Sequence, residues 1–385
     1  MRIRLAQPAL ARLLQVAARI VPARSPLPVA SGVLLRARPG WLEVMATDLE
    51  MTATLGAPAT VEEEGEVVLP ARFLGDLVRR APATDLELST REEALAVRLA
   101  WPDADFLLQG MNPEDFPRPV DFPQEAAQLD VRGGDLARAV RRTAFAASQD
   151  QARPILTGIL LEITAGRISA LATDGFRIAR QEVVREASEE EAAAAAETAA
   201  TRAAQPAGGL VVPARSLEML AALGETEEEI RLAGDGSRLY ARAGGFSFQA
   251  SLLQGSYPQV LAAVPQRFVA TWQLGRAELL AASERVSLLG GGREQTPLKL
   301  RFGDGRVVVA ADAPELGRAH EELPPLEEGE PMEIAFNPRF WMEGLKALEG
   351  ERVRVELSGP LSAARLSDPD DGSFFYVVMP MRTVG

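Results

Sequence analysis

Residues 172–177 read ATDGFR, and related phrases stand at residues 46–50 (ATDLE) and 310–314 (AADAP). Each phrase closes an apolar run that indicates a strand. Upstream of each lies a Leu/Ala/Arg pattern typical of an amphipathic helix, at residues 10–21, 136–147 and 279–289. Downstream of each stand a short strand-like run, a Pro and Arg, and a second helical pattern, at residues 67–77 (VVLPARFLGDL), 210–220 (LVVPARSLEML) and 333–345 (EIAFNPRFWMEGL). The sequence therefore contains three similar repeats.

The repeats are spaced by roughly 120 residues, which is the size of a domain and not of a solenoid unit. We expect three domains, at residues 1–124, 125–264 and 265–385, with Pro-rich linkers at residues 112–128 and 257–267. Each repeat reads as helix, strands, helix, strands. This order predicts an α+β fold in which two helices of each domain pack on local antiparallel sheets.

Composition excludes several classes of protein. An apolar fraction of 47% in 385 residues supports well-packed cores, and the absence of an apolar run of 18 residues or a signal peptide favours a soluble, cytoplasmic protein. The Arg-rich start resembles a transit peptide, but the same pattern recurs inside the chain, so we interpret it as part of the first repeat. The chain has no cysteine and a single histidine, His320, so we expect no metal site and no cofactor.

The net charge of −13 argues against nucleic-acid binding, but its distribution argues for it. The helical patterns hold more basic than acidic residues, which predicts a positive face if the helices lie on one side. The alternative is that Arg simply favours exposed helix positions. An acidic and Ala-rich insertion at residues 187–209 has no apolar stripe, so we expect an exposed excursion without a catalytic role.

Carboxylate chemistry is the main catalytic possibility, through Asp48, Asp174 and Asp312. Their recurrence favours a structural role, because a side chain repeated in three domains serves the fold, here as a strand-end turn that accepts local N–H bonds. A hydrolase that uses Asp174 with Glu162 or Glu182 is the remaining enzymatic alternative. The Gly-rich residues 290–293 lack the Lys-Ser/Thr of a phosphate-binding loop. We predict that the protein is not an enzyme.

The end of the chain, residues 374–382 (FFYVVMPMR), is apolar and contains two methionines. Methionine adapts to varied apolar partners, and Pro380 limits strand pairing beyond it. The segment is interpreted as a binding edge, with a plain core strand as the alternative.

Four stretches together resemble a known family: RPILTGILLE (153–162) before ATDGFR, VVPAR (211–215), FNPRFWMEGLKAL (336–348) and YVVMPMR (376–382). They resemble the beta subunit of bacterial DNA polymerase III, the sliding clamp, over the whole chain. The resemblance implies a DNA clamp fold and a head-to-tail homodimeric ring of six domains. Such a ring encircles duplex DNA without sequence specificity and gives processivity in DNA replication. It tethers the polymerase III catalytic subunit, the clamp loader and other replication and repair proteins.

Helix dimensions agree with a dimer. Six helices of roughly 10 Å diameter, standing in a circle, leave a hole too narrow for duplex DNA, whereas twelve leave a hole of roughly 28 Å. Two chains are therefore needed to enclose DNA.

The resemblance also implies site residues. Four positions match DNA contacts of similar clamps: Arg24, Arg72, Gln149 and Arg215. The partner-peptide pocket matches Leu156, Thr173, Gly175, Phe176, Arg177, Ile178, Pro258, Val377, Val378, Met379, Pro380, Met381 and Arg382. The dimer interface matches Phe106, Leu288 and Leu289. The sequence departs from the family at Phe176, where His is common, and at Ala262 and Ala263, where larger or basic residues often flank the pocket.

The alternative to a clamp is a three-domain peptide-binding scaffold, a divergent clamp paralogue that does not encircle DNA. A clamp requires two chains and a positive inner face, whereas a scaffold requires neither.

Overall fold

The computed structural model describes residues 1–91, 95–124, 128–164, 167–184, 209–290, 296–313 and 316–382. Residues 187–208 of the predicted insertion, residues 291–293 of the Gly-rich stretch and the last three residues lie outside this part of the chain. The chain forms two compact units, residues 1–134 with 219–252 and residues 135–218 with 253–385.

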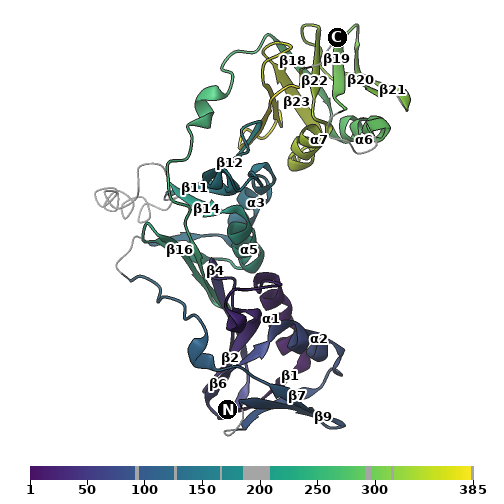
Figure 1. The fold of residues 1–385 in the computed structure, drawn as a ribbon. Coiled ribbons are helices and arrows are strands. Elements are labelled where there is room, and N and C mark those ends of the chain that lie inside the picture. The colour runs from purple at the N-terminus through teal and green to yellow at the C-terminus, as the bar shows by residue number, and fades with distance from the viewer. Residues whose placement is uncertain are drawn as a thin grey trace. The chain divides into compact units, whose positions relative to one another are not determined.

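The same order of elements occurs three times (Figure 1): a strand, a helix, four strands, a second helix and three strands, with one extra strand, β5, in the first repeat. The first repeat contains β1 (Arg2–Ala6), α1 (Gln7–Ile20), η1 (Pro28–Ser31), β2 (Gly32–Arg38), β3 (Trp41–Thr47), β4 (Met51–Pro58), β5 (Thr60–Glu63), β6 (Gly65–Pro70), α2 (Ala71–Arg80), β7 (Asp85–Arg91), β8 (Ala96–Trp101) and β9 (Ala104–Gln109). The linker η2 (Pro113–Asp115) follows. The second repeat contains β10 (Gln128–Val131), α3 (Gly133–Arg141), η3 (Ala144–Ala146), η4 (Pro154–Thr157), β11 (Gly158–Thr164), β12 (Arg167–Thr173), β13 (Arg177–Val184), β14 (Leu210–Pro213), α5 (Ala214–Gly224), β15 (Ile230–Gly234), β16 (Arg238–Ala243) and β17 (Phe246–Ser251). The linker η6 (Val260–Ala263) follows. The third repeat contains β18 (Ala270–Gly275), α6 (Arg276–Ser287), η7 (Leu288–Gly290), β19 (Leu298–Gly303), β20 (Arg306–Ala313), β21 (Gly317–Leu323), β22 (Met332–Phe336), α7 (Pro338–Ala347), β23 (Arg352–Leu357), β24 (Ala364–Ser367) and β25 (Phe374–Val378).

The strands form four sheets, and two of these combine successive repeats. One eight-stranded sheet has the order β10-β15-β16-β17-β4-β3-β2-β6, and the other β14-β11-β12-β13-β25-β24-β23-β18. The strand pairs β17–β4 and β13–β25, both antiparallel, join the repeats. The sequence led us to expect sheets confined to one repeat, and this expectation is wrong for these two sheets. The two remaining sheets have the orders β5-β1-β7-β8-β9 and β21-β20-β19-β22.

The strand registers align the three repeats residue by residue. Gly32 pairs with Pro70, and Gly158 pairs with Pro213. In the third repeat Asn337 is equivalent to these two prolines, and the residue before it, Phe336, pairs with Leu298. Counting along these strands, Met45, Leu171 and Ala310 are equivalent, because they pair with the equivalent residues Leu34, Leu160 and Lys299. We use "counterpart" for positions related in this way.

The register corrects one prediction about the repeated aspartates. The carboxylate of Asp48 accepts hydrogen bonds from the N–H groups of Glu50 and Met51, and that of Asp174 from Phe176 and Arg177, so the turn role is confirmed for both. Asp312 is instead the counterpart of Thr173, lies within β20 opposite Arg318, and forms an ion pair with it. Its prediction as a strand-end turn is wrong, because the ladder continues through Asp312.

The helices bury the apolar stripes that the sequence predicts. In α1, Pro8 stands in the first turn and Leu10, Leu14 and Ala17 are buried. In α7, the Asn337 side chain accepts the N–H of Arg339 and Trp341 is fully buried against Phe336. The helix α3 ends at Arg141, earlier than predicted. The Thr143 hydroxyl donates to the carbonyl of Ala139 there, and a 3₁₀ turn replaces the expected last helical turn.

The tail is a core strand over most of its length. β25 lies between β13 and β24, and Phe374 and Tyr376 are fully buried. The prediction of a binding edge is therefore wrong for residues 374–378, because both edges of β25 are paired. No helix in the described residues is long and apolar enough to cross a membrane.

The first linker closes an apolar cluster on the first repeat. Phe116, 2% exposed, packs with the buried side chains of Leu34, Met45 and Val68. Its N–H donates to the carbonyl of Pro113, which fixes the turn that directs the ring inward.

We predict that Phe116→Ala lowers the free energy of unfolding by about 3–5 kcal/mol, because a buried ring leaves a cavity. Chemical denaturation measures the change. Val120→Ala, in the same linker at an exposed position, is the matched control and should change stability by less than about 0.5 kcal/mol. Equal effects of the two substitutions would contradict the role of Phe116.

Candidate functional site

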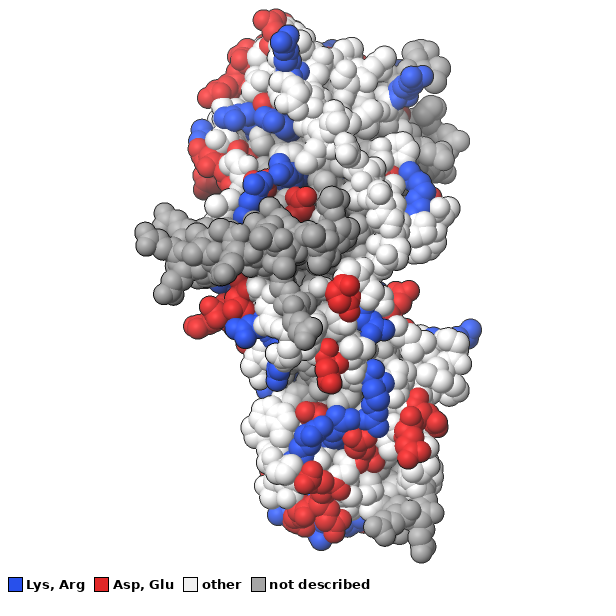
Figure 2. Space-filling model, turned by 90° about the vertical axis from the view of Figure 1, so that its left-hand side faces the viewer, with Lys and Arg blue, Asp and Glu red and all other residues white. Residues whose placement is uncertain are grey.

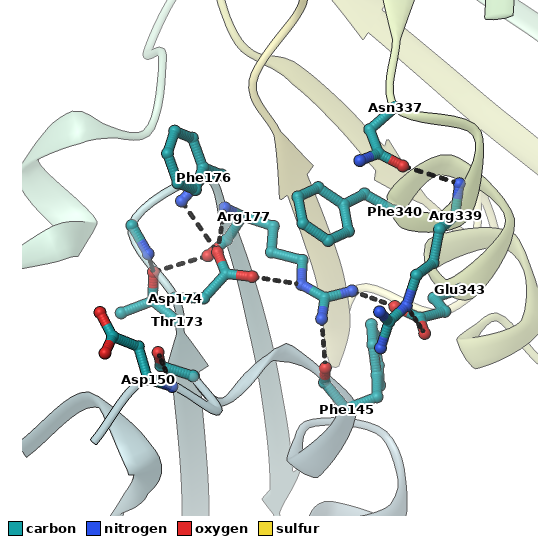
Figure 3. A network of polar contacts seen from close by, with 12 residues as sticks. Phe145, Asp150, Thr173, Asp174, Phe176, Arg177, Asn337, Arg339, Phe340 and Glu343 are labelled. Carbon is teal, nitrogen blue, oxygen red and sulfur yellow. Dashed lines mark hydrogen bonds and ion pairs between the residues drawn. The ribbon is translucent and has the colours of Figure 1, made fainter. Parts of the chain in front are cut away.

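Arg177, the last residue of ATDGFR, connects the second repeat to the third. Its side chain is only 4% exposed. Figure 3 shows the guanidinium between Asp174, Phe145 and Glu343. Its Nε donates to Asp174 (2.9 Å), Nη1 donates to Glu343 on α7, and Nη2 donates to the carbonyl of Phe145 (2.6 Å). The guanidinium lies 4.2 Å from the ring centre of Phe340. Burial lowers the pKa of Arg177, but contacts with Tyr376, Glu343 and Asp174 more than offset this and raise it. Arg177 is therefore a charged anchor of the internal junction.

A second buried arginine reinforces the same junction. Arg142, 2% exposed, donates to the carbonyl of Ala347 at the end of α7 and to Asp371 before β25. Burial raises the pKa of Asp371, but hydrogen bonds from Ser373 and Arg142 reverse the effect and leave it below its ordinary value. A cavity of about 340 Å³ lies beside these groups, lined by Arg141, Arg142, Phe145, Glu343, Lys346, Ala347 and Glu349.

The turn that precedes Arg177 holds Phe176 toward solvent. Gly175 adopts φ +96°, a left-handed conformation that favours glycine, and its N–H donates to the Thr173 hydroxyl. The N–H of Met379 donates to the carbonyl of Phe176 at 2.9 Å. Phe176 is 59% exposed and Met379 45% exposed. Two large apolar side chains are thus held at the surface by main-chain bonds.

An apolar cluster lies next to this pair. Ile178 and Val377, paired across β13 and β25, pack with Leu171, Val264 and Ala363. Partly buried hydrophobic residues surround them: Leu160, Tyr257, Val260 and Phe375. Burial raises the pKa of the Tyr257 phenol well above its ordinary value, which agrees with an apolar setting. We call Phe176, Met379 and this cluster the apolar site.

The junction of the first two repeats provides an internal comparison. There Glu50 and Ser251 are the counterparts of Phe176 and Met379, and the N–H of Ser251 donates to the carbonyl of Glu50 at 2.8 Å. The same main-chain bond therefore supports a polar pair at one junction and an apolar pair at the other. The fold does not require Phe176 and Met379 to be apolar, which points to binding.

The structure divides the predicted pocket residues into three groups. Ile178 and Val377 belong to the apolar cluster, and Gly175, Phe176, Pro258, Met379 and Arg382 are exposed around it. Leu156, Thr173 and Val378 are buried, and Pro380 and Met381 are partly buried. Arg177 is separate, because neighbouring residues of a strand point to opposite faces, so its side chain lies on the face opposite Ile178. Sequence analysis missed Leu160, Tyr257, Val260 and Phe375.

The predicted DNA-binding residues Arg24, Arg72, Gln149 and Arg215 are all exposed. Arg24 and Arg72 belong to one compact unit, and Gln149 and Arg215 to the other. The predicted excess of positive charge on the helices is partly neutralised. Arg142 is buried, Arg138 pairs with Glu349 and Asp371, and Arg79 pairs with Asp76. On the face that Figure 2 shows, basic and acidic side chains are interspersed.

The predicted interface residues lie near free sheet edges. Phe106 is on the edge strand β9, with its ring centre 5.1 Å from that of Trp101. Leu288 is 76% exposed and Leu289 partly buried.

The carboxylates of the hydrolase alternative do not form a facing pair. Asp174 is bound to Arg177, whereas Glu182 pairs with Arg167 and Arg180. Glu162 and Glu182 stand on strands that β12 separates.

Comparison with known proteins matches the chain along its whole length. Three family descriptions match in succession, namely the DNA polymerase III beta subunit N-terminal domain at residues 1–120, central domain at 130–259 and C-terminal domain at 262–382. The beta sliding clamp of Synechococcus elongatus is 32% identical over 378 residues, covering 96% of each chain. A Pseudomonas aeruginosa sliding clamp structure, DNA polymerase III subunit beta bound to griselimycin, has 28% identity, a TM-score of 0.88 and 100% coverage of both chains. The DNA polymerase sliding clamp of Bacillus subtilis shares the fold, with a TM-score of 0.90 at 23% identity and 100% coverage of both chains.

We predict that Arg177→Met, which installs the residue found at the counterpart Met51, destabilises the protein by about 3–5 kcal/mol, because Asp174 and Glu343 lose their buried partner. Thermal or chemical denaturation measures the loss. Arg167→Met, which removes an exposed ion pair with Glu182, is the control and should cost less than about 1 kcal/mol. A similarly small loss for Arg177→Met would contradict the anchoring role.

Proposed function

The chain belongs to the beta sliding clamp family of bacterial DNA polymerase III and is a non-catalytic DNA sliding clamp with the three-domain clamp fold, and from this we propose that two copies close into a head-to-tail ring around duplex DNA. In this proposal the domains are residues 1–124, 125–264 and 265–385, and the ring works in the cytoplasm. It tethers the polymerase III catalytic subunit, the clamp loader and other proteins that carry a clamp-binding motif.

One observation supports the ring. The two internal junctions use the same strand pairing, and each end of the chain has one of the two strands of such a pair at a sheet edge. At each junction the fourth strand of one repeat, β4 or β13, pairs with the last strand of the next repeat, β17 or β25. The third repeat offers β21 as an edge strand, and the first repeat offers β9. Pairing of β21 with β9 of a second copy would join the four-stranded and the five-stranded sheet into one continuous sheet of nine strands, the extra strand being β5.

The register of the closing pair follows from the internal junctions. Ala53 pairs with Phe248 and Ala179 with Tyr376. Their counterparts are Ala319 on β21 and Phe106 on β9, so we expect Ala319 to stand opposite Phe106 of the second copy. Leu288 is the counterpart of Phe145, whose ring centre lies 5.6 Å from that of Tyr376. The closing contact therefore brings Leu288 against Phe106.

Closure within one chain is excluded by helix dimensions. Pairing of β21 with β9 of the same chain gives a ring of six helices, and helices of roughly 10 Å diameter then leave too narrow a hole for a duplex. The ring therefore needs two chains.

The DNA contact in this proposal is electrostatic. Arg24, Arg72 and Arg215 are exposed, and Arg side chains bind phosphate oxygens without reading bases. Gln149 adds an uncharged polar contact. Binding to the backbone is sensitive to salt, so topological enclosure and not affinity keeps the ring on DNA.

The partner contact in this proposal is the apolar site. Its exposed pair, Phe176 and Met379, adjoins the cluster of Ile178 and Val377 on the sheet face. Such a surface takes the apolar side chains of a short peptide segment, and methionine allows different peptides to fit. Phe176, where His is common in the family, makes the site more apolar. Ala262 and Ala263 put small side chains at two linker positions where larger or basic residues often flank the pocket in the family.

A scaffold that never encircles DNA is the second candidate function. It shares the apolar site with the clamp but does not require complementary free edges at the two ends of the chain, so the edges β9 and β21 favour the clamp.

The ring predicts that Leu288→Asp weakens dimerisation at least ~100-fold, because a carboxylate is buried at both closing contacts. Sedimentation equilibrium measures the dimer constant. Leu326→Asp changes another exposed leucine, 58% exposed, and should leave the dimer unchanged. Dimers of unchanged affinity in Leu288→Asp would contradict the proposed closing contact.

The apolar site predicts that Phe176→Glu with Met379→Ser, which recreates the polar pair of the first junction, weakens peptide binding roughly 10-fold or more, since two apolar contacts are lost. The probe is a fluorescent peptide carrying the clamp-binding segment of the cognate polymerase III catalytic subunit, followed by anisotropy. Glu50→Ala with Ser251→Ala changes the counterpart positions and should have no effect. Unchanged peptide affinity in the first variant would place the partner site elsewhere.

A further inference from the structure

The second helix of the first repeat, α2, exposes an aromatic side chain that its counterparts in the other repeats do not. Phe73 is 57% exposed. Its counterparts, which also follow the Arg of the Pro-Arg motif, are Ser216 and Phe340. Ser216 is 2% exposed, and Phe340 lies in the internal junction with the Arg177 guanidinium 4.2 Å from its ring centre. The position is thus covered in the two repeats that have a preceding repeat, and it is open in the first.

Two further pairs of counterparts show the same difference, in which the residue of the second repeat is buried and its counterpart in the first or third repeat is exposed. Arg142 is 2% exposed at the internal junction, whereas its counterpart Arg285 is 59% exposed and pairs with Glu321. Met219 is 5% exposed, whereas the side chain of its counterpart Asp76 is 55% exposed. Phe73 therefore belongs to a surface of the first repeat that is exposed in a single chain. The surface that fits it is the exposed side of the third repeat that carries Arg285.

The third repeat has no arginine at the position equivalent to Arg177, whose guanidinium contacts Phe340. The register makes Gly317 the counterpart of Arg177, because Arg318 stands opposite Asp312 as Ile178 stands opposite Thr173. A Cβ added to Gly317 would meet no atom within 4 Å, so the space next to its Cα, where the missing side chain would begin, is open. Beside it lies Leu288, the counterpart of Phe145, whose ring contacts the same guanidinium with a separation of 5.6 Å.

We propose that in the ring Phe73 of one copy fills the space that corresponds to the Arg177 guanidinium and packs against Leu288 of the second copy. The inference rests on the proposed ring. It adds Phe73 to the closing contact, as an apolar side chain at the place where the internal junction has the charged Arg177. Leu288 then touches two aromatic rings of the second copy, those of Phe106 and Phe73. The closing contact resists salt, because none of these three side chains carries a charge.

Cysteine cross-linking tests the placement directly, since the chain contains no cysteine of its own. The full chain carrying Phe73→Cys and Leu288→Cys is treated with a short bismaleimide, and covalent dimers are measured on denaturing gels. Phe106→Cys with Leu288→Cys reports on the ring itself. Phe73→Cys with Leu326→Cys is the negative control, because Leu326 is also an exposed leucine of the third repeat, at 58%, but lies outside the proposed contact. Sedimentation of the untreated variants shows whether they dimerise.

Covalent dimers from the 73–288 pair and none from the 73–326 pair are the expected result. Cross-linking of the 106–288 pair without the 73–288 pair would overturn the placement of Phe73 while the ring stands. The ring and this inference would both be overturned if the parent chain and the variants are monomers in sedimentation and neither the 73–288 nor the 106–288 pair cross-links.

A double-mutant cycle measures the same contact without new chemistry. Phe73→Ser installs the residue of the counterpart Ser216 and should weaken the dimer at least ~10-fold. In a chain that already carries Leu288→Ser, adding Phe73→Ser should change the dimer constant by much less, because the partner of Phe73 has been removed. Fully additive effects would contradict the contact. Phe73 is exposed in the single chain, so circular dichroism of the variants should match the parent.

Discussion

Main-chain pairing between the last strand of one repeat and an outer strand of the preceding repeat is the constraint on which the structure depends. It turns two four-stranded sheets into one of eight strands at each internal junction, through β4–β17 and β13–β25. An unpaired strand edge is a row of unused hydrogen-bonding groups. In a chain built by this rule, the strands equivalent to those paired at the junctions, β9 in the first repeat and β21 in the last, remain at sheet edges. Assembly into a closed ring satisfies both.

The side chains on the sheet face that packs against the helices differ between the junction of the second and third repeats and the proposed closing contact between two copies. Between the second and third repeats, the buried Arg142 binds the carbonyl of Ala347 and the carboxylate of Asp371, and the buried Arg177 binds the carboxylate of Glu343, all in the third repeat. Removing one partner of such a network is costly, which suits a junction that stays closed. At the proposed closing contact the counterparts are an exposed Arg285 and Gly317, and the contact depends on Leu288, Phe106 and Phe73. A clamp must open to admit DNA, and an apolar contact without a buried charge network separates with fewer unpaired charges.

The opposite sheet face carries the proposed partner site, and comparison of the repeats shows why such a site would occur at one junction only. The turns at Asp48 and Asp174 have the same hydrogen bonds, yet one presents Glu50 and the other Phe176. In the first repeat the linker residue Phe116 seals the corresponding cluster. In the second repeat Tyr257 and Val260 leave the cluster only partly covered. The same turn hydrogen bonds thus support a polar surface at one junction and, at the other, the apolar surface that we propose binds partners.

Local chemistry was predictable from the sequence, and long-range pairing was not. The turns at Asp48 and Asp174 depend on atoms within three residues, and the helices follow from apolar spacing, so both were predicted well. The place of β25 between β13 and β24 depends on partners far away in the chain, and its prediction as a binding edge was wrong. Arg177 was assigned to the pocket by resemblance, but the face on which its side chain lies is set by the register of β13. The order of strands in the sheets, and with it the open edges, required the structure.

Retention on circular and linear duplex DNA tests the central claim most directly. The protein is loaded by the cognate clamp loader onto a nicked circle, the salt concentration is raised, and the protein that remains bound is measured before and after the circle is cut. Because phosphate contacts weaken steeply with salt, only enclosure retains the protein under these conditions. The account predicts retention on the circle and rapid loss once free ends exist. Equal loss from circular and linear DNA would contradict enclosure and favour a scaffold that binds partners through the apolar site alone.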